Sequence, residues 1–508
     1  MHQSIHKLIR ECADLNIRLD NNLPLNLRFL VWISPTSIRN PELSVLWQPL
    51  HDRRKTFAKL FTYSTIIGYS IAYGLYKFLK YRGFYCQQFK NKSPVLLIIP
   101  DVIVDEPEEF KTNYLIEDED YQVDKLLFSY SKKRLKQAPR FSTLNSINKM
   151  VLFLKLFTAI LNDLVKQLFK RKITWRYLDA LLLFSGWILS QSWYFVWDLY
   201  HMLNNCGISS CNKYLLSLHE MHSYSKVVWT VANEKGLSGI AVQHALIMPE
   251  KLWYFPDKSE IRANYPLPDI FFVCSDETKE LLQPLYPKTE FQNSCSPRFS
   301  HWKQFFTLKH PVGERVYSKC TQKDKSNRKV ILFVNSAAIH DIVVIKAMYK
   351  LMQLELNENI SLRFRTHPNF GLNFFDQFRP PPHVSLSFSE QFRIKMAVKL
   401  RKIEISSKPL REDLDEADLV IGANSTVIQE AALMGVSVMG VCDDDYIASS
   451  ILPSSSICQV DKLTRDELNQ CMIKKQDDFQ IQRLKTNIGV FSPNLTTKLI
   501  FDLCNIAN

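Results

Sequence analysis

Glycine is scarce in this chain of 508 residues. Only 13 glycines are present and they are scattered, so neither a P-loop nor a GxGxxG phosphate loop can be found. This absence disfavours P-loop ATPases and nicotinamide-dependent dehydrogenases. The eleven cysteines include no CxxC pair and no Cys/His cluster with zinc spacing. They are interpreted as reduced core residues of a cytosolic protein, and neither a metal site nor a cofactor is expected.

Long uninterrupted apolar runs are also missing. The first residues, "MHQSIHKLIRECADLNIRLD", carry too many charges for a signal peptide. Residues 60–76 approach the length of a membrane span but are rich in Ser, Thr, Tyr and Gly, and residues 180–197 carry Ser and Gln at their centre. Both are interpreted as buried helices of a large core. The protein is therefore expected in the cytoplasm, and peripheral attachment to the inner membrane is left open.

Positive charge is in excess. The net charge of +13 and the pI near 9.1 favour an anionic partner, such as anionic lipid or a nucleotide-activated substrate. No basic-aromatic module or helix-turn-helix stands out, so no nucleic-acid partner is expected. Residues 150–172 have the period of a basic amphipathic helix. Its apolar face is formed by Phe153, Phe157, Ile160, Leu164 and Leu168. This face is expected to point into a core, the alternative being a helix on an anionic membrane surface.

The length and the order of apolar runs predict the fold class. A chain of 508 residues exceeds one hydrophobic core, so two domains or more are expected. Buried strands are expected at 27–34 and 95–100. From residue 213 onward short apolar runs alternate with helical patterns, and after a lysine-rich segment at 318–329 the alternation restarts. Such alternation indicates parallel sheets made of βαβ units. We therefore expect an α/β protein with two Rossmann-like domains whose parallel sheets face a central cleft.

Polar residues follow several of the expected strands, where ligands of such sheets bind. In "LHEMH", Glu220 could act as a general base, the alternative being a surface acidic residue. In "AVQHA", His244 could act as a base or an oxyanion donor, or bond a backbone carbonyl. In "FRTHPNF", Arg365 and His367 could contact phosphate oxygens, with Pro368 directing the histidine, unless this is only a structural turn.

The stretch "LVIGANSTVIQEAALMGVSVMGV" is interpreted as a strand, a helix and a second strand. Thr426, with a glutamine three residues later, matches a capping box, so Thr426 is expected to cap the helix. Asn424, Ser425 and Thr426 lie where the backbone N–H groups of a helix N-terminus favour an anion, and they are candidate phosphate ligands. Glu430 could accept hydrogen bonds from the hydroxyl groups of a ribose.

Taken in order, several of these motifs resemble one family. "HEMHSYSKVVWTVANEKG", "IAVQHA", "PLPDIFFVCS", "CSPRFS", "RTHPN" and "ADLVIGANSTVIQEAALMG" are similar to GT-B-type glycosyltransferases of the bacterial surface carbohydrate (capsule and LPS) group. Relatives of that group include Kdo- and sialyltransferases and CDP-glycerol glycerophosphotransferases. The resemblance covers residues 213–441. It implies a GT-B-like fold with an acceptor-side domain at 1–322, including helical and acidic insertions, and a nucleotide-donor-binding domain at 323–480. A C-terminal helix at 481–508 could cross back to the first domain.

The same resemblance implies the roles of individual residues on the donor side. His367 would meet the donor phosphate and help the leaving group depart. Ser425 and Thr426 would bind the same phosphate, and Glu430 would touch the ribose. The helix N-terminus and His367 would neutralise the departing nucleotide, so that no bound metal is needed.

On the acceptor side, the resemblance implies that Glu220 or His244 supplies the base. The reaction would move a sugar from a CMP-, CDP- or UDP-linked donor to a surface polysaccharide or a lipid-linked glycan. Two alternatives remain open: polyol-phosphate transfer from a CDP-glycerol-type donor, and a non-catalytic scaffold of a polysaccharide-synthesis complex. A nucleotide-sugar 2-epimerase also carries "HPN", but "CDDDYIAS" lacks the Thr-Glu-Arg-Pro-Glu run of that family.

Overall fold

The chain divides into two units. A computed structural model describes residues 2–34, 36, 64, 67–68, 70–76, 78–79, 83–89, 93–100, 123–129, 138–190, 193–217, 222–243, 247, 252–263, 265–274, 276–294, 329–334, 341–354, 359–366, 403–423, 425–434, 436–442 and 457–473. The described residues up to 294 belong to unit 1 and those from 329 to 473 belong to unit 2. The expected boundaries at 322 and 480 fall outside the described residues and stay predictions.

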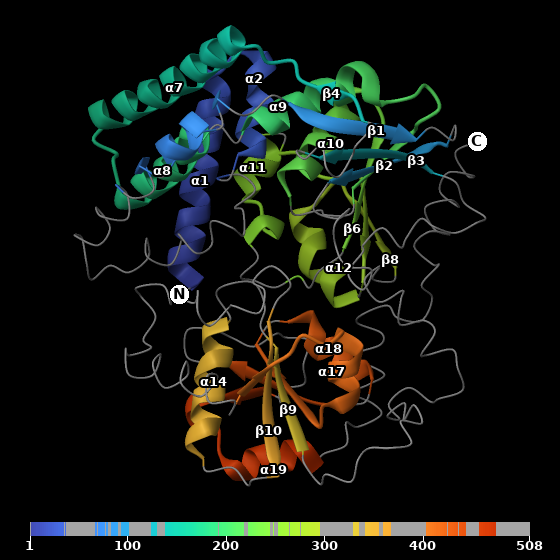
Figure 1. Cartoon of the computed structure of the whole chain (residues 1–508). Coiled ribbons are helices and arrows are strands. Elements are labelled where there is room, and N and C mark those ends of the chain that lie inside the picture. Colours follow the sequence, from blue (N-terminus) through green and yellow to red (C-terminus); the bar gives the residue numbers. More distant parts are fainter. Residues whose placement is uncertain are drawn as a thin grey trace. The chain divides into compact units, whose positions relative to one another are not determined.

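Unit 1 is built on an eight-stranded sheet with the order β4-β1-β3-β2-β5-β6-β7-β8 (Figure 1). Its parallel strands are β2 (Val95–Pro100), β3 (Asp124–Ser129), β5 (Tyr214–Ser217), β6 (Ser238–Val242), β7 (Ile270–Val273) and β8 (Glu290–Asn293). Near one edge, β1 (Phe84–Phe89) is antiparallel to both of its neighbours, β3 and the edge strand β4 (Arg140–Phe141). From β2 the chain adds β3 on one side and β5 to β8 on the other. The strand order therefore reverses between β2 and β5.

Helices pack around the sheet of unit 1. They are α1 (His2–Asn22), α2 (Leu25–Ile33), α7 (Ser146–Phe169), α8 (Trp175–Leu189), α9 (Trp193–Met202), α10 (Ser223–Glu234), α11 (Lys258–Arg262) and α12 (Asp276–Leu282), with short turns at Leu203–Gly207, Leu252–Tyr254 and Gln283–Leu285. The expected strand at 95–100 is confirmed as β2, whereas the expected strand at 27–34 is wrong because these residues form α2. A short continuous apolar run has no period that separates a buried helix from a buried strand.

The apolar stretch 180–197 is divided between two helices, α8 and α9. Their large side chains are buried, among them Phe184, Trp193 and Tyr194, each at most 1% exposed. The prediction of buried helices is thus confirmed for this stretch. For residues 60–76 it is wrong in the described part, where Ile71 and Leu75 are 44% and 61% exposed. Among the described residues, no helix combines the length and the apolar character that crossing a membrane requires.

Helix α7 is amphipathic as expected, but its orientation differs from the prediction. Of the five residues expected to point inward, only Ile160 is buried; Phe153, Phe157 and Leu164 are half-buried, and Leu168 is 62% exposed. The buried face also includes Lys149, Asp163 and Gln167. Asp163 and Lys149 have partners on other helices, and Gln167 donates to Asp163 within α7, so the apolar period of α7 alone does not define which face is buried.

Unit 2 contains a parallel six-stranded sheet with the order β11-β10-β9-β12-β13-β14. The strands are β9 (Lys329–Val334), β10 (Ile360–Arg365), β11 (Ile403–Ile405), β12 (Leu419–Gly422), β13 (Ser437–Cys442) and β14 (Ile457–Gln459). The helices are α14 (Asp341–Gln353), α17 (Leu410–Glu416), α18 (Thr426–Leu433) and α19 (Arg465–Ile473), with a short turn at Val460–Lys462. Helix α14 covers one face, and α17 and α18 cover the other (Figure 1).

The order of strands in unit 2 is that of the Rossmann fold. Numbered from β9 in chain order, the strands read 3-2-1-4-5-6 across the sheet, and the order reverses between β9 and β12. The predicted fold class, α/β with two parallel-dominated sheets, is confirmed. The shared central cleft stays a prediction.

Aspartates accept backbone hydrogen bonds at the amino edges of both sheets. Asp269, just before β7, accepts a hydrogen bond from Gly239 N at 2.7 Å, and Asp418, just before β12, accepts one from Val330 N at 2.8 Å. Each carboxylate satisfies a backbone donor at the start of the neighbouring strand, which would otherwise lack a ladder partner. These aspartates at the amino edges therefore have a structural role, whereas ligands of such sheets bind at the carboxyl ends of the strands.

Candidate functional site

Three strands of unit 2 end level with one another at the carboxyl edge. Val334 at the end of β9 pairs with Arg365 of β10 on one side and with Gly422 of β12 on the other. Neighbouring strands lie about 4.8 Å apart, so the ends of β10 and β12 are about 10 Å apart. His367 follows Arg365 by two residues and Asn424 follows Gly422 by two, and both lie outside the described residues. The two motifs thus leave the same sheet edge, on either side of β9.

Ser425 caps the helix that follows β12. Its backbone is extended (φ −91°, ψ 135°), and its Oγ accepts a hydrogen bond from Val427 N at 3.3 Å. The prediction that Thr426 caps this helix is wrong: Thr426 is the first helical residue, and its side chain lies outside those described. A serine hydroxyl has one proton and two lone pairs. Capping uses a lone pair, which leaves the proton for donation to a phosphate oxygen.

Gly422 brings α18 close to the strand end. A Cβ at this position would lie 2.8 Å from Ile428 Cδ1 and 2.8 Å from Val334 Cγ2, closer than side chains pack. The absence of a side chain therefore lets the first turn of α18 pack directly over β9 and β12. The sequence contained this signal, a glycine at the end of an apolar strand. Ala431 and Ala432 of α18 are small and fully buried, which also allows close packing of this helix.

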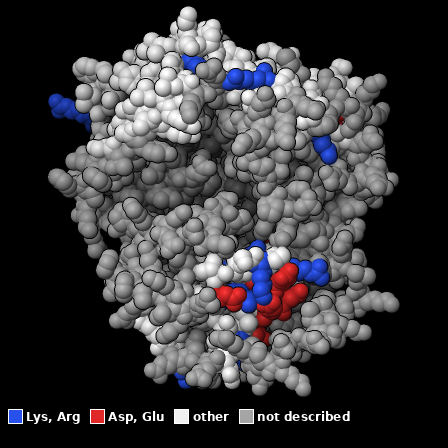
Figure 2. Space-filling model, viewed as in Figure 1, with Lys and Arg blue, Asp and Glu red and all other residues white. Residues whose placement is uncertain are grey.

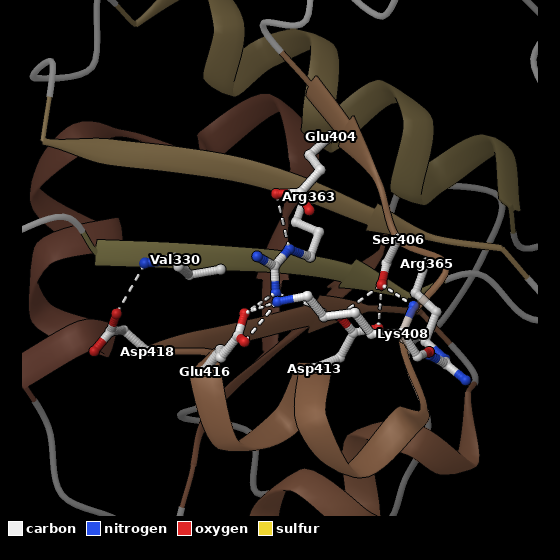
Figure 3. Close-up of polar contacts among 9 residues, drawn as sticks. All are labelled: Val330, Arg363, Arg365, Glu404, Ser406, Lys408, Asp413, Glu416 and Asp418. Carbon is white, nitrogen blue, oxygen red and sulfur yellow. Dashed lines mark hydrogen bonds and ion pairs between the residues drawn. The ribbon is translucent and has the colours of Figure 1, made fainter. Parts of the chain in front are cut away.

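Arg365 lies at the end of β10, as expected, but part of its guanidinium has structural partners. Its Nη1 donates to Lys408 O at 2.6 Å and to Asp413 Oδ2 at 2.8 Å (Figure 3). Asp413 also accepts a hydrogen bond of 2.6 Å from Ser406 Oγ. A phosphate contact from Arg365 stays a prediction, and it would have to come from the other guanidinium nitrogens.

A charged cluster lies beside this strand end. Arg363 contacts Glu416 at 2.6 Å and Glu404 at 3.1 Å, and Lys408 contacts Glu416 at 2.6 Å (Figure 3). Burial favours a higher pKa for Glu416, but hydrogen bonds from Lys408 and Arg363 outweigh it and lower this pKa below its usual value. Figure 2 shows blue and red atoms side by side in this region. Because cations and carboxylates are paired here, the cluster has the character of a structural network.

Glu430 belongs to the first turns of α18 and is 2% exposed. Its carboxylate therefore lies inside unit 2. The expected contact with a ribose hydroxyl stays a prediction, and it requires a ligand that reaches this interior position.

The carboxyl edge of unit 1 carries the ends of β5 and β6. Ser217 ends β5, and Gln243 follows β6 with its Oε1 accepting a 2.8 Å hydrogen bond from Cys274 N, which extends the link between β6 and β7. Glu220 and His244 come three and one residues after these positions and lie outside the described residues. Their catalytic roles stay predictions. Since β5 adjoins the reversal point, Glu220 follows the strand at which a ligand of unit 1 would bind.

No group of three or more His, Cys, Asp or Glu side chains within the described part of the chain is placed to hold a metal ion. The acidic run 443–445 lies outside that part. The cysteines that the structure describes are all free thiols.

The two sheets define this chain as an α/β protein with two doubly wound units, and the second unit has the strand order of dinucleotide-binding domains. No family model matches the chain, and no curated protein matches it in sequence. Solved structures show a distant likeness. The UDP-forming α,α-trehalose-phosphate synthase of Burkholderia xenovorans is 11% identical with a TM-score of 0.41, covering 82% of this chain and 100% of the synthase.

Two further structures are similar to the same extent. The UDP-GlcNAc 2-epimerase of Neisseria meningitidis bound to UDP-GlcNAc is 12% identical with a TM-score of 0.42, covering 82% of this chain and 100% of the epimerase. A glycosyltransferase of Rickettsia africae is 12% identical with a TM-score of 0.43, covering 81% of this chain and 98% of the transferase. At these scores the function of this chain has to be argued from its own strand order and residues.

Proposed function

We propose that this protein is a GT-B-type glycosyltransferase of the surface carbohydrate group. It would transfer a sugar from a CMP-, CDP- or UDP-linked donor to a surface polysaccharide or lipid-linked glycan acceptor, without a bound metal. One observation carries the proposal: Ser425 caps a helix at the point where the Rossmann-type strand order of unit 2 reverses. Crevices at such reversals bind nucleotides, and helix N-termini there bind their phosphates.

The donor phosphate would lie over the N-terminus of α18. The hydroxyl proton of Ser425 and the positive end of the helix dipole would stabilise the negative charge that grows on the leaving nucleotide. His367, following β10 at the same edge, would donate a second hydrogen bond to that phosphate. Asn424 and Thr426 flank Ser425 in sequence and are the neighbouring candidates.

The acceptor hydroxyl would be activated from unit 1. Glu220 or His244 would take the proton of this hydroxyl while its oxygen attacks the anomeric carbon of the donor sugar. The bond from that carbon to the donor phosphate breaks, and the electron pair leaves with the nucleotide. The N-terminus of α18 would stabilise the charge that builds up at the phosphate.

Nucleotide binding tests the proposal directly. Thermal shift and calorimetry with CMP, CDP, UDP and GDP would be run on the wild-type chain, Ser425→Asp and His367→Ala. Aspartate is as good a helix cap as serine, so Ser425→Asp keeps α18 intact while its charge repels a phosphate. Ser437→Ala, at the amino end of β13, is the matched control.

We expect one nucleotide to stabilise the wild type and Ser437→Ala. Binding should be at least about tenfold weaker in both site variants, since a hydrogen bond to a charged group contributes about 1.5–3 kcal/mol. If no nucleotide stabilises the wild-type chain, the transferase proposal fails and the scaffold alternative gains. If Ser425→Asp binds as well as the wild type, the phosphate does not lie at α18.

A further inference from the structure

Helix α7 exposes a continuous row of apolar side chains on the outside of unit 1. The exposed members are Ile147, Met150, Val151, Leu154, Leu161, Val165, Leu168 and Phe169, from 43% to 83% exposed. From the first to the last the row spans 22 residue steps, or about 33 Å at 1.5 Å per residue. Single exposed apolar residues are common, but a contiguous row of this length marks an interaction surface.

Polar contacts on the buried face of α7 fix the orientation in which this row is exposed. On the opposite face of α7, Asp163 accepts a 3.0 Å hydrogen bond from Arg18 Nε of α1 and a 3.2 Å bond from the Tyr177 hydroxyl of α8. Lys149 Nζ lies 5.2 Å from the ring centroid of Tyr194. Turning the helix to bury the apolar row would break these contacts, each of which stabilises the present orientation of α7. The exposed row is therefore a consequence of the fold of unit 1.

The rim of the row is basic. Exposed cations accompany α7 and the turn after it: Lys155, Lys166, Lys170, Arg171 and Lys172. The acidic residue of this segment, Asp163, is buried, and Trp175 after the turn is 48% exposed. Figure 2 shows a broad white surface over α7 with blue atoms beside it. An apolar face bounded by Lys, Arg and aromatic side chains suits a bilayer surface with anionic headgroups.

A second exposed apolar row belongs to the same unit. In the helical residues 70–76, Ile71 is 44% and Leu75 61% exposed, while Gly74 faces α8, where a side chain would overlap the Leu189 carbonyl. Helix α8, which packs against α7, thus also packs against a second helix whose outer face is apolar. Unit 1 thus presents apolar surface on two of the helical segments that contact α8.

We propose that unit 1 docks on an anionic lipid bilayer through the exposed row of α7, with the helix in the plane of the interface. Charge complementarity favours lipid over a second copy of this chain. A second copy would present the same basic rim, whereas anionic headgroups supply the negative charge that the described part of this face lacks on its surface. Docking is independent of the proposed transferase activity, because it needs no nucleotide.

Vesicle sedimentation with the full chain tests this docking. Vesicles of phosphatidylcholine alone and of phosphatidylcholine mixed with phosphatidylglycerol would be compared, because only the mixture carries the anionic headgroups that attract basic segments. The test variant is Leu154→Glu combined with Val165→Glu, both exposed on α7. Its control is Leu281→Glu, a leucine of α12 that is 42% exposed.

We expect the wild type and Leu281→Glu to bind the anionic vesicles, and the α7 variant to bind at least about tenfold more weakly. Binding of the wild type should also weaken in high salt, since headgroup attraction is screened. Light scattering would follow the oligomeric state, and circular dichroism the thermal midpoint. Absence of wild-type binding, or equal loss in both variants, would overturn the proposal. So would a wild-type dimer that only the α7 variant dissociates, because the row would then be a contact between two copies.

Discussion

Asp163 in unit 1 and Asp413 in unit 2 are both buried carboxylates bound by arginine, but they join different elements. Asp163 is 1% exposed and joins three helices, receiving Arg18 of α1 and Tyr177 of α8. Asp413 is fully buried and joins a helix to a sheet, receiving Arg363 of β10 at 3.3 Å. The first carboxylate orients a surface helix, and the second holds the strand ends beside the candidate phosphate site.

The two aspartates also differ in how their partners are solvated. Arg363 and Arg365 side chains are only 7% and 14% exposed, whereas the Arg18 side chain is 28% exposed. A cation that reaches water can be rehydrated when its partner is removed, and a buried one cannot. The comparison therefore predicts that unit 2 depends on its aspartate more strongly than unit 1 does.

The largest effect is expected from Asp413→Ala. Removing this carboxylate takes away the carboxylate that the largely buried Arg365 contacts and one of the three that Arg363 contacts, so the free energy of unfolding of unit 2 should fall by about 3–5 kcal/mol. Hydrogen exchange of peptides from β10 and α17 in increasing urea measures it. Asp415→Ala is the control, because its 3.9 Å pair with Arg411 is solvent-accessible and contributes about 0–1 kcal/mol. Equal losses in the two variants would contradict the role of Asp413.

A smaller effect is expected from Asp163→Ala. Its arginine can turn to water, so the free energy of unfolding of unit 1 should fall by about 1.5–3 kcal/mol, the contribution of hydrogen bonds to a charged group. Exchange of α7 peptides measures it, with Asn162→Ala on the exposed face as control. Should Asp163→Ala cost more than Asp413→Ala in the same assay, the comparison between the two units is wrong.

The comparison can be sharpened by removing the hydroxyl group that donates a hydrogen bond to each aspartate. Ser406 donates to Asp413 at 2.6 Å, whereas Tyr177 donates to Asp163 at 3.2 Å. We expect Ser406→Ala to cost about 1.5–3 kcal/mol of unfolding free energy and Tyr177→Phe about 0.5–1.5 kcal/mol, because the shorter bond in the buried site is the stronger. Urea denaturation measures both. A larger loss in Tyr177→Phe than in Ser406→Ala would contradict the greater strength assigned to the shorter bond.

The smallest expected effects are opposite pH dependences of the stability of unit 1 and unit 2. Glu416 has a lowered pKa, so its contribution to stability is present above the usual value of 4.5 and is lost as the pH falls further. Burial raises the pKa of Glu11 in α1 despite the opposing charge of Arg18, so protonation of Glu11 stabilises unit 1 as the pH falls toward 4.5. Glu416→Gln should reduce the loss of stability of unit 2 in acid. Glu11→Gln should reduce the gain in stability of unit 1 as the pH falls. Hydrogen exchange of peptides from both units, followed between pH 7 and 3, measures these changes. The prediction is wrong if the stabilities of the two units change in the same direction.

Much of the fold follows from local pattern. Most strands from β5 to β13 are short apolar runs bounded by polar residues, and the sequence predicts their alternation with helices from residue 213 onward. Before that residue the sequence predicts β2 but not β1, β3 or β4, and it predicts a strand where α2 lies. At the candidate site, the adjacent hydroxyls of Ser425 and Thr426 were correctly placed at a helix start. Only the backbone conformation at Ser425 shows which of them is the cap.

Neighbouring residues were enough to determine the alternation of strands and helices, the two parallel sheets and the strand ends that carry polar motifs. Periodicity is a property of adjacent residues, so it can be read before the chain is folded. The outward face of α7 and the partners of Asp413 were decided by the tertiary structure alone. Arg18 and Asp163 stand 145 residues apart, and Arg363 and Asp413 stand 50 apart. Their pairing exists only once the intervening elements have packed, because a buried charge selects its partner by position in space.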